Sequence, residues 1–251
     1  MKKCLVITAF NRPQHLENTL QSALKHCENI PVWIFIDGPR GVEDVINVKT
    51  CKDVAIEFKK QYRYEAKIFT SDENRGLAQS IINAANTAFS IYEYVIFLED
   101  DIVTSKEFYK FMDLCAEVYE HNANVMQVSG FNYNNKHVNT DTLKSYFLPF
   151  TTSWGWATWR RAWQHFNNDH NHWQHYFSSI RRRRRFDAFG GFYNQLQRNY
   201  SGTINTWAVF WYATVFEQQG LVISPETSLI KNIGHDGTGE NCGTSNLQNV
   251  N

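Results

Sequence analysis

The sequence predicts an α/β fold in which a mainly parallel central sheet is flanked by helices. Between residue 3 and about residue 128, short apolar runs alternate with amphipathic segments of helical period, a pattern that is typical of βαβ units. The chain has 251 residues, of which 43% are hydrophobic and 15% aromatic, so it can bury one substantial core, or a core and a smaller lobe.

The first expected strand begins at the N-terminus. Two lysines precede an apolar run, as in a signal peptide, but the run stops at Asn11, Arg12 and Pro13 and no cleavage site follows. No apolar stretch reaches the roughly 18 residues that suggest a membrane span. We therefore expect a buried strand here, and a cytoplasmic protein that is soluble or peripheral at the inner face of the cytoplasmic membrane.

The remaining elements of residues 1–130 follow in alternation. Strands are expected at 4–9, 32–36, 66–69, 94–98 and 125–128, and helices at 14–25, 42–60, 77–88 and 106–120. The apolar residues of the last helix recur at helical spacing, which indicates core packing and not a cofactor site. They are Phe108, Phe111, Met112, Cys115, Val118 and Tyr119.

The composition changes after residue 130. Residues 131–242 are rich in aromatic residues, Asn and His, and we expect them to form the second half of the same domain, with helices near 186–199 and 207–218 and a strand at 221–223. Residues 243–251 read as a flexible tail, because the chain after Ile233 is rich in Gly, Asn and Thr.

Charge and cysteine content exclude some classes of protein. Twenty-five basic residues balance 25 acidic ones, so the overall field does not point to nucleic acid or an acidic substrate. The five cysteines are odd in number, scattered and without metal-ligand spacing, which fits reduced thiols in a reducing compartment.

The strongest chemical signal is a run of three carboxylates after a fully apolar strand. Residues 95–98 lead directly into Glu99, Asp100 and Asp101. Because the carboxyl ends of strands face the ligand crevice in open α/β sheets, these charges are expected where a ligand binds. Adjacent carboxylates repel one another unless a cation compensates, and oxygen ligands suit Mg²⁺ or Mn²⁺. The alternative is a solvated strand end that caps the next helix.

Three other strand ends place polar groups on the same expected rim. Asn11 and Arg12 follow the first strand, and Arg12 could pair with a phosphate or a base carbonyl. Asp37 follows the second strand and could accept a hydrogen bond from a base or ribose. Arg75 and Gly76 precede a helix, as in many anion sites. Each segment alone is equally typical of a turn or a helix entry, and their convergence carries the prediction.

These strand-end segments resemble a known family. Residues 7–13, 35–38, 74–77 and 98–101 resemble the donor half of GT-A glycosyltransferases, and the Glu-Asp-Asp motif is similar to that of the N-acetylglucosaminyltransferase that begins N-glycan branching. Residues 153–159 and 232–239 look more like bacterial transferases of capsule and lipopolysaccharide synthesis. The resemblance covers nearly the whole chain, to about Cys242.

The resemblance implies a Rossmann-like GT-A fold, with donor binding by residues 1–130 and acceptor binding and catalysis by residues 131–242. It implies that Asp101 binds the divalent ion and that Asp100 and Glu99 contact the sugar and nucleoside. It further implies that Arg75 lies near the diphosphate and that the nucleotide lies against the first two strand ends and the mouth of the third helix. The nucleotide-binding residues so implied are Ala9, Asn11, Arg12, Asp37 and Gly76.

Two segments of the second half point to the acceptor and the metal. Trp154 and Trp156 flank Gly155 and are expected to form an acceptor platform, because Trp offers a broad surface to the C–H face of a sugar. They could equally belong to the core. His235 lies in a Gly-rich loop, and a C-terminal His completes the metal site in several GT-A enzymes. A hydrogen-bonding role is the alternative.

A general base is needed for inversion at the anomeric carbon. Relatives often carry Asp at the position of Asn205, and Asn cannot serve as the base. Asp236, Asp187 or Glu240 could substitute, or the chain could be impaired.

Five consecutive arginines mark a possible contact with an anionic partner. A run of this kind is usually a solvated surface segment, but it also suits a peripheral membrane or an acidic acceptor. The residues are Arg181, Arg182, Arg183, Arg184 and Arg185.

The favoured function is sugar transfer from a nucleotide-sugar donor, with a UDP-sugar preferred, to an oligosaccharide or lipid-linked glycan acceptor. The use of Mn²⁺ or Mg²⁺ and no nucleic-acid partner are expected. A sugar nucleotidyltransferase is disfavoured because Asn11, Arg12 and Pro13 replace the Gly-rich loop that holds a triphosphate. The non-enzyme alternative is a carbohydrate-binding relative without turnover.

Overall fold

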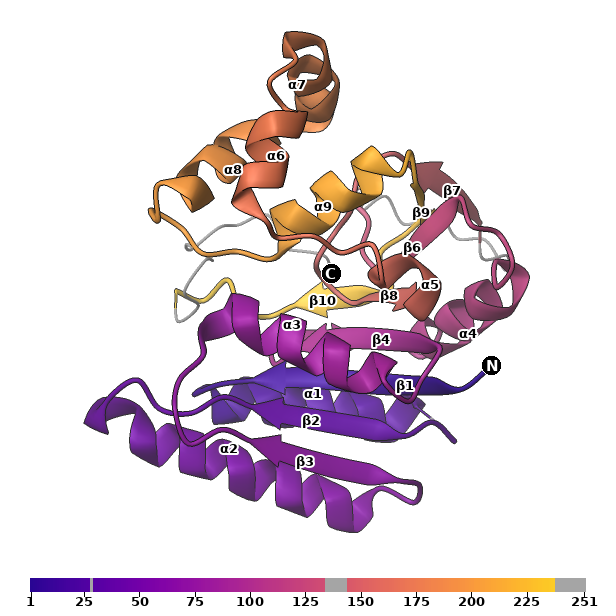
Figure 1. Cartoon of the computed structure of the whole chain (residues 1–251). Coiled ribbons are helices and arrows are strands. Elements are labelled where there is room, and N and C mark those ends of the chain that lie inside the picture. The colour runs from indigo at the N-terminus through magenta and orange to yellow at the C-terminus, as the bar shows by residue number, and fades with distance from the viewer. Residues whose placement is uncertain (28, 134–143, 238–251) are drawn as a thin grey trace.

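The computed structural model describes residues 1–27, 29–133 and 144–237. Within these residues, an eight-stranded sheet in the order β3-β2-β1-β4-β8-β6-β9-β7 forms the centre, and a second, two-stranded sheet pairs β5 with β10 (Figure 1). Helices cover both faces of the central sheet. The predicted α/β architecture with a mainly parallel sheet is confirmed.

Four parallel strands form the half of the sheet that contains the N-terminus: β1 (Lys3–Ala9), β2 (Val32–Ile36), β3 (Ala66–Thr70) and β4 (Tyr94–Glu99). Side chains alternate between two core clusters, with Leu5 and Ile7 in one and Cys4 and Val6 in the other. Burial on both faces explains why β1, β2 and β4 are apolar at nearly every position, whereas the edge strand β3 is partly exposed.

Three helices pack on each face of the sheet. Helices α1 (Pro13–His26), α2 (Val42–Gln61) and α4 (Phe108–Val118) contribute to one core cluster. Helices α3 (Gly76–Phe89), α5 (Arg160–Trp163) and α9 (Ala208–Glu217) contribute to the other. The result is a three-layer arrangement with the sheet in the middle.

The sheet continues beyond residue 130. Strand β8 (Trp156–Trp159) lies antiparallel between β4 and β6 (Val125–Ser129), and β9 (Leu221–Pro225) runs parallel to β6. Strand β7 (Ser145–Leu148) closes the edge, antiparallel to β9. The two halves expected from the sequence therefore share one sheet.

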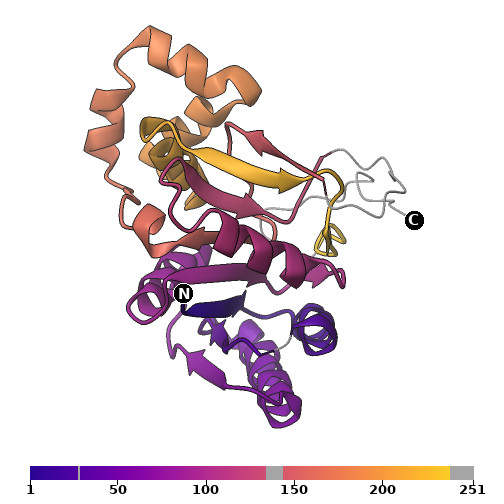
Figure 2. The same cartoon turned by 90° about the vertical axis from the view of Figure 1, so that its right-hand side faces the viewer.

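A helical cap, residues 170–200, lies over α9 (Figure 2). It consists of α6 (His170–Tyr176), α7 (Ile180–Phe186), the 3-10 helix η1 (Asp187–Phe189) and α8 (Phe192–Tyr200). Trp173, Phe177 and Phe186 pack there with Phe210 and Tyr212 of α9. The opposite side of α9 packs on the sheet, which explains why this helix is apolar on all sides.

Several elements differ from the sequence prediction. The single helix expected near 186–199 is wrong: α7 ends at Phe186 and α8 begins at Phe192. Gly190 and Gly191 lie in the break, where two residues of low helix propensity make continuation costly. The expected tail at 243–251, with Glu240 and Cys242, lies outside the described residues.

Within the described residues, no helix combines the length and apolar character needed to cross a bilayer. Cys4, Cys51 and Cys115 are buried free thiols, as expected from their scattered positions. Burial raises the pKa of Cys51 and of Cys115 to about 12, so both thiols stay protonated and unreactive at neutral pH.

Candidate functional site

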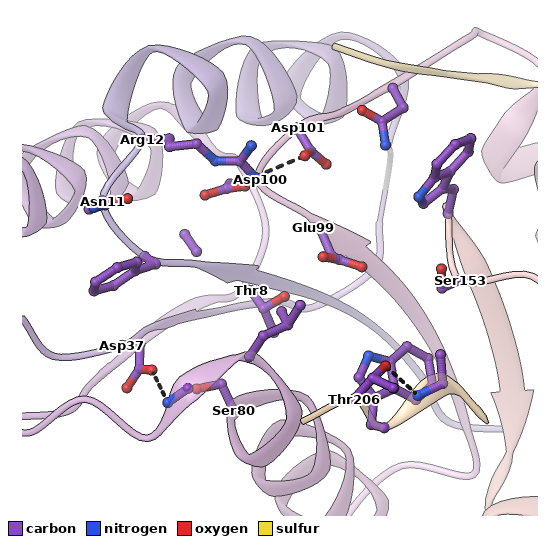
Figure 3. Close-up of a pocket in the computed structure, with 18 of the residues that line it drawn as sticks. Thr8, Asn11, Arg12, Asp37, Ser80, Glu99, Asp100, Asp101, Ser153 and Thr206 are labelled. Atoms are coloured by element: carbon purple, nitrogen blue, oxygen red, sulfur yellow. Dashed lines mark hydrogen bonds and ion pairs between the residues drawn. The ribbon is translucent and has the colours of Figure 1, made fainter. Parts of the chain in front are cut away.

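A cavity lies at the carboxyl edge of the parallel strands, where the segments after β1, β2 and β4 meet the start of α9 (Figure 3). The structure brings together there most of the residues predicted from the strand ends. The lining residues that the sequence also predicts are Ala9, Asn11, Arg12, Asp37, Gly76, Glu99, Asp100, Asp101 and Trp154.

The acidic turn after β4 is held rigidly. Asp100 and Asp101 are buried, with only 4% and 5% of their surfaces exposed. The Thr19 hydroxyl of α1 donates to the Asp100 carbonyl at 2.7 Å, and the Ile233 N–H donates to the Asp101 carbonyl at 2.8 Å. Donors from two distant parts of the chain therefore hold the backbone carbonyls of the turn, and so position its carboxylates.

Strands β5 (Ile102–Thr104) and β10 (Ile230–Asn232) bring the C-terminal segment to this turn. They pair antiparallel, with Asn232 opposite Ile102. Gly234 lies two residues after the end of β10, and a Cβ at this position would overlap the Asp101 carboxylate. A residue without a side chain is therefore required for this segment to close over the acidic turn.

Arg12 is the cation of the acidic turn. Its Nη2 donates to Asp101 Oδ2 at 2.8 Å and also to Asp100 Oδ1. The sequence predicted a phosphate or base carbonyl as the partner of Arg12, and the structure pairs it with the two aspartates. The guanidinium thus bridges carboxylates that would otherwise repel each other.

The pKa values of Glu99 and Asp100 are raised above those of free carboxyl groups. Burial, followed by the charges of Asp101 and Asp100, raises the pKa of Glu99 to about 8. Burial also raises the pKa of Asp100 to about 6, although Arg12 opposes this shift. Arg12 therefore offsets only part of the cost of ionising these buried carboxyl groups.

Asp37 organises the loop before α3. Its carboxylate accepts hydrogen bonds from the backbone N–H groups of Gly38, Arg75 and Gly76, at 2.9 to 3.1 Å. This pattern fixes Gly76, whose φ of 75° lies in the left-handed region, at the cavity wall. The side chain of Arg75 is exposed and does not line the cavity, so the structure does not bring it to the predicted position.

Asn11 is held by a residue that the sequence analysis missed. Its side-chain amide donates to Asp44 Oδ1 at 2.5 Å, and Arg40 Nε donates to Asp44 Oδ2 at 2.9 Å. Arg40 also lies over the Phe10 ring, 4.8 Å from its centroid. Asp44 looks like an ordinary first-turn carboxylate of α2 in the sequence, so no local signal distinguishes it.

The two tryptophans expected to form a platform have different environments. Trp154 lines the cavity and meets the His235 ring edge-on, with 5.3 Å between centroids. Trp156 is 1% exposed, and its ring stacks between Phe97 and Trp207 in the core. The prediction that Trp156 shares an acceptor platform is wrong, because β8 belongs to the central sheet and turns this side chain inward.

Gly155 separates the two tryptophans for a backbone reason. Its φ is 56°, and an added Cβ would lie 2.9 Å from Ile230 Cγ2. Gly155 is buried and does not line the cavity, so its contribution is the left-handed turn that lets Trp154 and Trp156 face different ways.

Of the predicted base candidates, the two that the structure describes, Asp236 and Asp187, do not line the cavity. Asn205 is exposed and does not line it, whereas the next two residues, Thr206 and Trp207, do. Asp236 pairs with His15, at 3.1 Å between Oδ2 and Nε2, and Asp187 belongs to the helical cap. Among the described residues, the carboxylates that line the cavity are those of Asp37, Glu99, Asp100 and Asp101.

Several uncharged lining residues were not predicted as site residues. Short polar side chains in strands and helix entries are common, and nothing in the local pattern marks these. They are Thr8, Ser80, Ser153, Thr206 and Asn232.

Comparison with known proteins identifies the family. The family model described as glycosyl transferase family 2 matches residues 4–192. The chain belongs to this family. The match spans β1 to the start of α8 and so includes the acidic turn and Trp154, but not Asn205 or the segment that carries His235.

Solved structures show weaker similarity. S. aureus TarS residues 1–349 are 18% identical, with 65% of this chain and 48% of that chain covered and a TM-score of 0.43. The galactosyltransferase LgtC is 9% identical, with 84% and 70% covered and a TM-score of 0.42. A cytidylyltransferase from Leptospira borgpetersenii is 14% identical, with 64% and 61% covered and a TM-score of 0.38. No curated protein sequence matches. The family 2 chain thus spans about half of the TarS chain.

The carboxylates of the acidic turn could hold a divalent cation. Mg²⁺ and Mn²⁺ are commonly held by one or two carboxylates together with phosphates of the substrate. Burial is the main cause of the raised pKa values of Glu99 and Asp100, and a bound cation would favour the ionised forms of both groups. Across the described parts of the chain, no three His, Cys, Asp or Glu side chains converge on one cation position. The protein alone would therefore supply part of the ligand set.

Proposed function

We propose that this family 2 chain transfers a sugar from a nucleotide-sugar donor to a glycan acceptor. The observation that carries the proposal is the convergence of Asp100 and Asp101, both buried, on a cavity that Trp154 also lines. The carboxylates could hold the cation that a diphosphate requires, and the indole ring offers an apolar surface to a sugar.

The donor would lie with its diphosphate at the acidic turn. Asp101, with Asp100, would hold a divalent cation, Mn²⁺ or Mg²⁺, which when bound neutralises charge on the departing nucleoside diphosphate. Asn11 and Asp37 line the cavity just after the carboxyl ends of β1 and β2 and would contact the nucleoside. Glu99, the last residue of β4, would face the transferred sugar.

Arg12 would act in two settings. In the donor-free chain it neutralises the aspartates, as the bridging hydrogen bonds indicate. When a cation and a diphosphate are bound, its guanidinium would be free to donate to phosphate oxygens, which it recognises well because it presents several N–H groups in a plane.

The acceptor would approach from the side of Trp154 and Trp207. Trp154 is partly exposed at the cavity and held edge-on by Phe131, with 4.7 Å between ring centroids. A rigid ring of this kind can contact the C–H face of a sugar with little loss of conformational entropy. We propose an oligosaccharide or a lipid-linked glycan as the acceptor, a UDP-sugar as the donor, and bacterial capsule or lipopolysaccharide assembly in the cytoplasm as the setting.

A carbohydrate-binding relative without turnover is the second candidate. Asn205 favours it, because the described part of the cavity contains no carboxylate apart from Asp37 and the acidic turn. A sugar nucleotidyltransferase is less compatible, since the loop between β1 and α1 is short and carries no glycine.

Release of nucleoside diphosphate distinguishes these functions. Purified chain would be incubated with UDP-, GDP- and TDP-sugars and Mn²⁺, with and without a mixture of bacterial glycans. Acceptor-stimulated release by the wild-type chain, and its loss in EDTA and in Asp101→Asn, would support transfer. Binding of glycans without any release would favour the carbohydrate-binding reading.

A further inference from the structure

The five consecutive arginines lie on helix α7, at the outer end of the helical cap. Figures 1 and 2 both place the cap at one end of the molecule and α2 at the opposite end. Arg181, Arg182, Arg184 and Arg185 are exposed, and Arg183 is half-buried. Among the described residues, no residue of α7 lines the cavity, so this surface is separate from the proposed donor site.

No neighbouring carboxylate in the described residues offsets the charge of these arginines. Within the described residues, none of them makes an ion pair with a carboxylate. Arg182 instead donates to the Tyr176 carbonyl at 3.1 Å, and Arg183 donates to the Ser178 carbonyl at 3.0 Å. Carbonyls and rings hold the guanidiniums without neutralising them, so a dense positive charge remains on a chain whose net charge is zero.

Two large apolar side chains flank the charged residues. Ile180 is 63% exposed at the start of α7, and Phe189 is 56% exposed just after it. Single exposed apolar residues are ordinary on a protein surface. Along the chain they stand before and after the basic residues, and the Phe189 ring also lies 5.3 Å from that of Phe150, between centroids. Exposed apolar side chains next to unneutralised basic ones suit a surface with anionic groups over an apolar layer.

We infer that Ile180, Phe189 and the exposed arginines of α7 form a docking surface for an anionic lipid bilayer. The charge attracts the headgroups, and Ile180 and Phe189 enter the boundary between headgroups and acyl chains. A soluble polyanion would satisfy the arginines but would offer nothing to the two apolar side chains. The inference does not depend on the proposed reaction, because the surface lies apart from the cavity.

Vesicle cosedimentation tests the inference. The full chain would be mixed at low salt with vesicles of phosphatidylcholine alone, or with about one third phosphatidylglycerol. Binding to the anionic vesicles only is expected. Replacing Arg181, Arg182, Arg184 and Arg185 by Gln should weaken it about a hundredfold or more, since each basic residue contributes roughly fivefold. The same four positions changed to Lys should retain most of the binding.

A matched control removes the same charge from the opposite end of the molecule. Lys49, Lys59, Lys60 and Arg63 are exposed on or just after α2, and their replacement by Gln should leave vesicle binding within about threefold. Circular dichroism and thermal unfolding of all variants would show that each is folded.

The apolar residues are tested by salt and by competition. Ile180→Ser with Phe189→Ser should bind anionic vesicles at low salt and release them at lower salt than the wild-type chain. The inference would be overturned if the wild-type chain did not bind the vesicles, or if the α7 and α2 variants lost binding equally. It would also be overturned if dextran sulfate bound as tightly as the vesicles and the Ile180/Phe189 variant bound it unchanged.

Discussion

Arg12 Nη2 lies 2.8 Å from Asp101 Oδ2, so the first loop of the fold supplies the counter-charge for the acidic turn after β4. The same nitrogen reaches Asp100. The side chain of Arg12 is 17% exposed and those of the two aspartates are 5% and 7% exposed, so the whole group is largely withdrawn from water. Its balance of charge therefore affects both stability and the affinity for a cation.

Replacing Arg12 by Gln should destabilise the metal-free chain by about 3 kcal/mol, because removal of one partner leaves buried carboxylates unpaired. Mn²⁺ should then restore stability more strongly than in the wild-type chain, since the cation no longer competes with the guanidinium. Thermal unfolding in EDTA and in Mn²⁺ measures both effects. Arg40→Gln is the control, because Arg40 pairs with Asp44 outside the acidic turn. Equal Mn²⁺ shifts in Arg12→Gln and wild type would contradict the account.

Glu99 should give the metal-free chain a characteristic pH dependence. Burial raises its pKa to about 8, from 4.5 for the unperturbed group. Below pH 4.5 it is protonated in both states; between 4.5 and about 8 only the unfolded chain releases the proton, so the stability falls as the pH rises. The slope contributed by Glu99 is at most about 1.4 kcal/mol per pH unit.

Glu99→Gln isolates this contribution. In EDTA, the variant should unfold at a higher denaturant concentration than the wild-type chain at pH 8, and at nearly the same concentration at pH 4.5. A variant that is no more stable than wild type at pH 8 would show that Glu99 is ionised in the folded chain at lower pH.

The two tryptophans should respond differently to truncation. Trp156→Ala removes a ring buried among Phe97, Trp163 and Trp207 and should cost about 3 to 5 kcal/mol of stability. Trp154→Ala removes a partly exposed ring and should cost much less, while weakening glycan binding at least tenfold. Chemical denaturation and glycan titration of the pair measure this contrast. A stable Trp156→Ala variant with impaired glycan binding would reverse the assignment.

Asn205→Asp tests whether a missing base limits turnover. Asn205 lies directly before Thr206 and Trp207, which line the cavity. Because the side chain of Asn205 is exposed and does not line the cavity, a carboxylate at this position should not reach the acceptor hydroxyl, and the rate of transfer should change by less than about threefold. Donor affinity should stay constant, and Asn205→Gln is the matched control. A rise of tenfold or more in Asn205→Asp alone would show that residue 205 does reach the acceptor and that the missing carboxylate limits transfer.

Much of the fold could be predicted because β1, β2, β4 and β6 are buried on both faces. Such strands are continuously apolar and end abruptly at polar residues, as at Glu99, so their positions are visible in the sequence. The same abrupt ends located Arg12, Asp37 and the acidic turn at one edge of the sheet.

The second half was harder to predict because its elements are short and specified by distant contacts. Strand β8 is four residues long and depends on β4 and β6 for its hydrogen bonds. Trp156 was therefore interpreted as a ligand platform when its inward direction follows only from the pairing. Asp44, which holds Asn11, was missed for a similar reason, since the contact joins residues 33 positions apart.

Calorimetric titration of nucleotide sugars tests the central claim most directly. UDP-, GDP-, CMP- and TDP-sugars would be titrated into the wild-type chain, Asp101→Asn and the control Asp53→Asn, which changes an exposed residue of α2. Each titration would be run with Mn²⁺ and with EDTA. We predict that sugars of one nucleotide class bind the wild-type chain and Asp53→Asn in Mn²⁺. EDTA should abolish this binding, and so should Asp101→Asn. Absence of binding by every donor in Mn²⁺ would contradict this prediction.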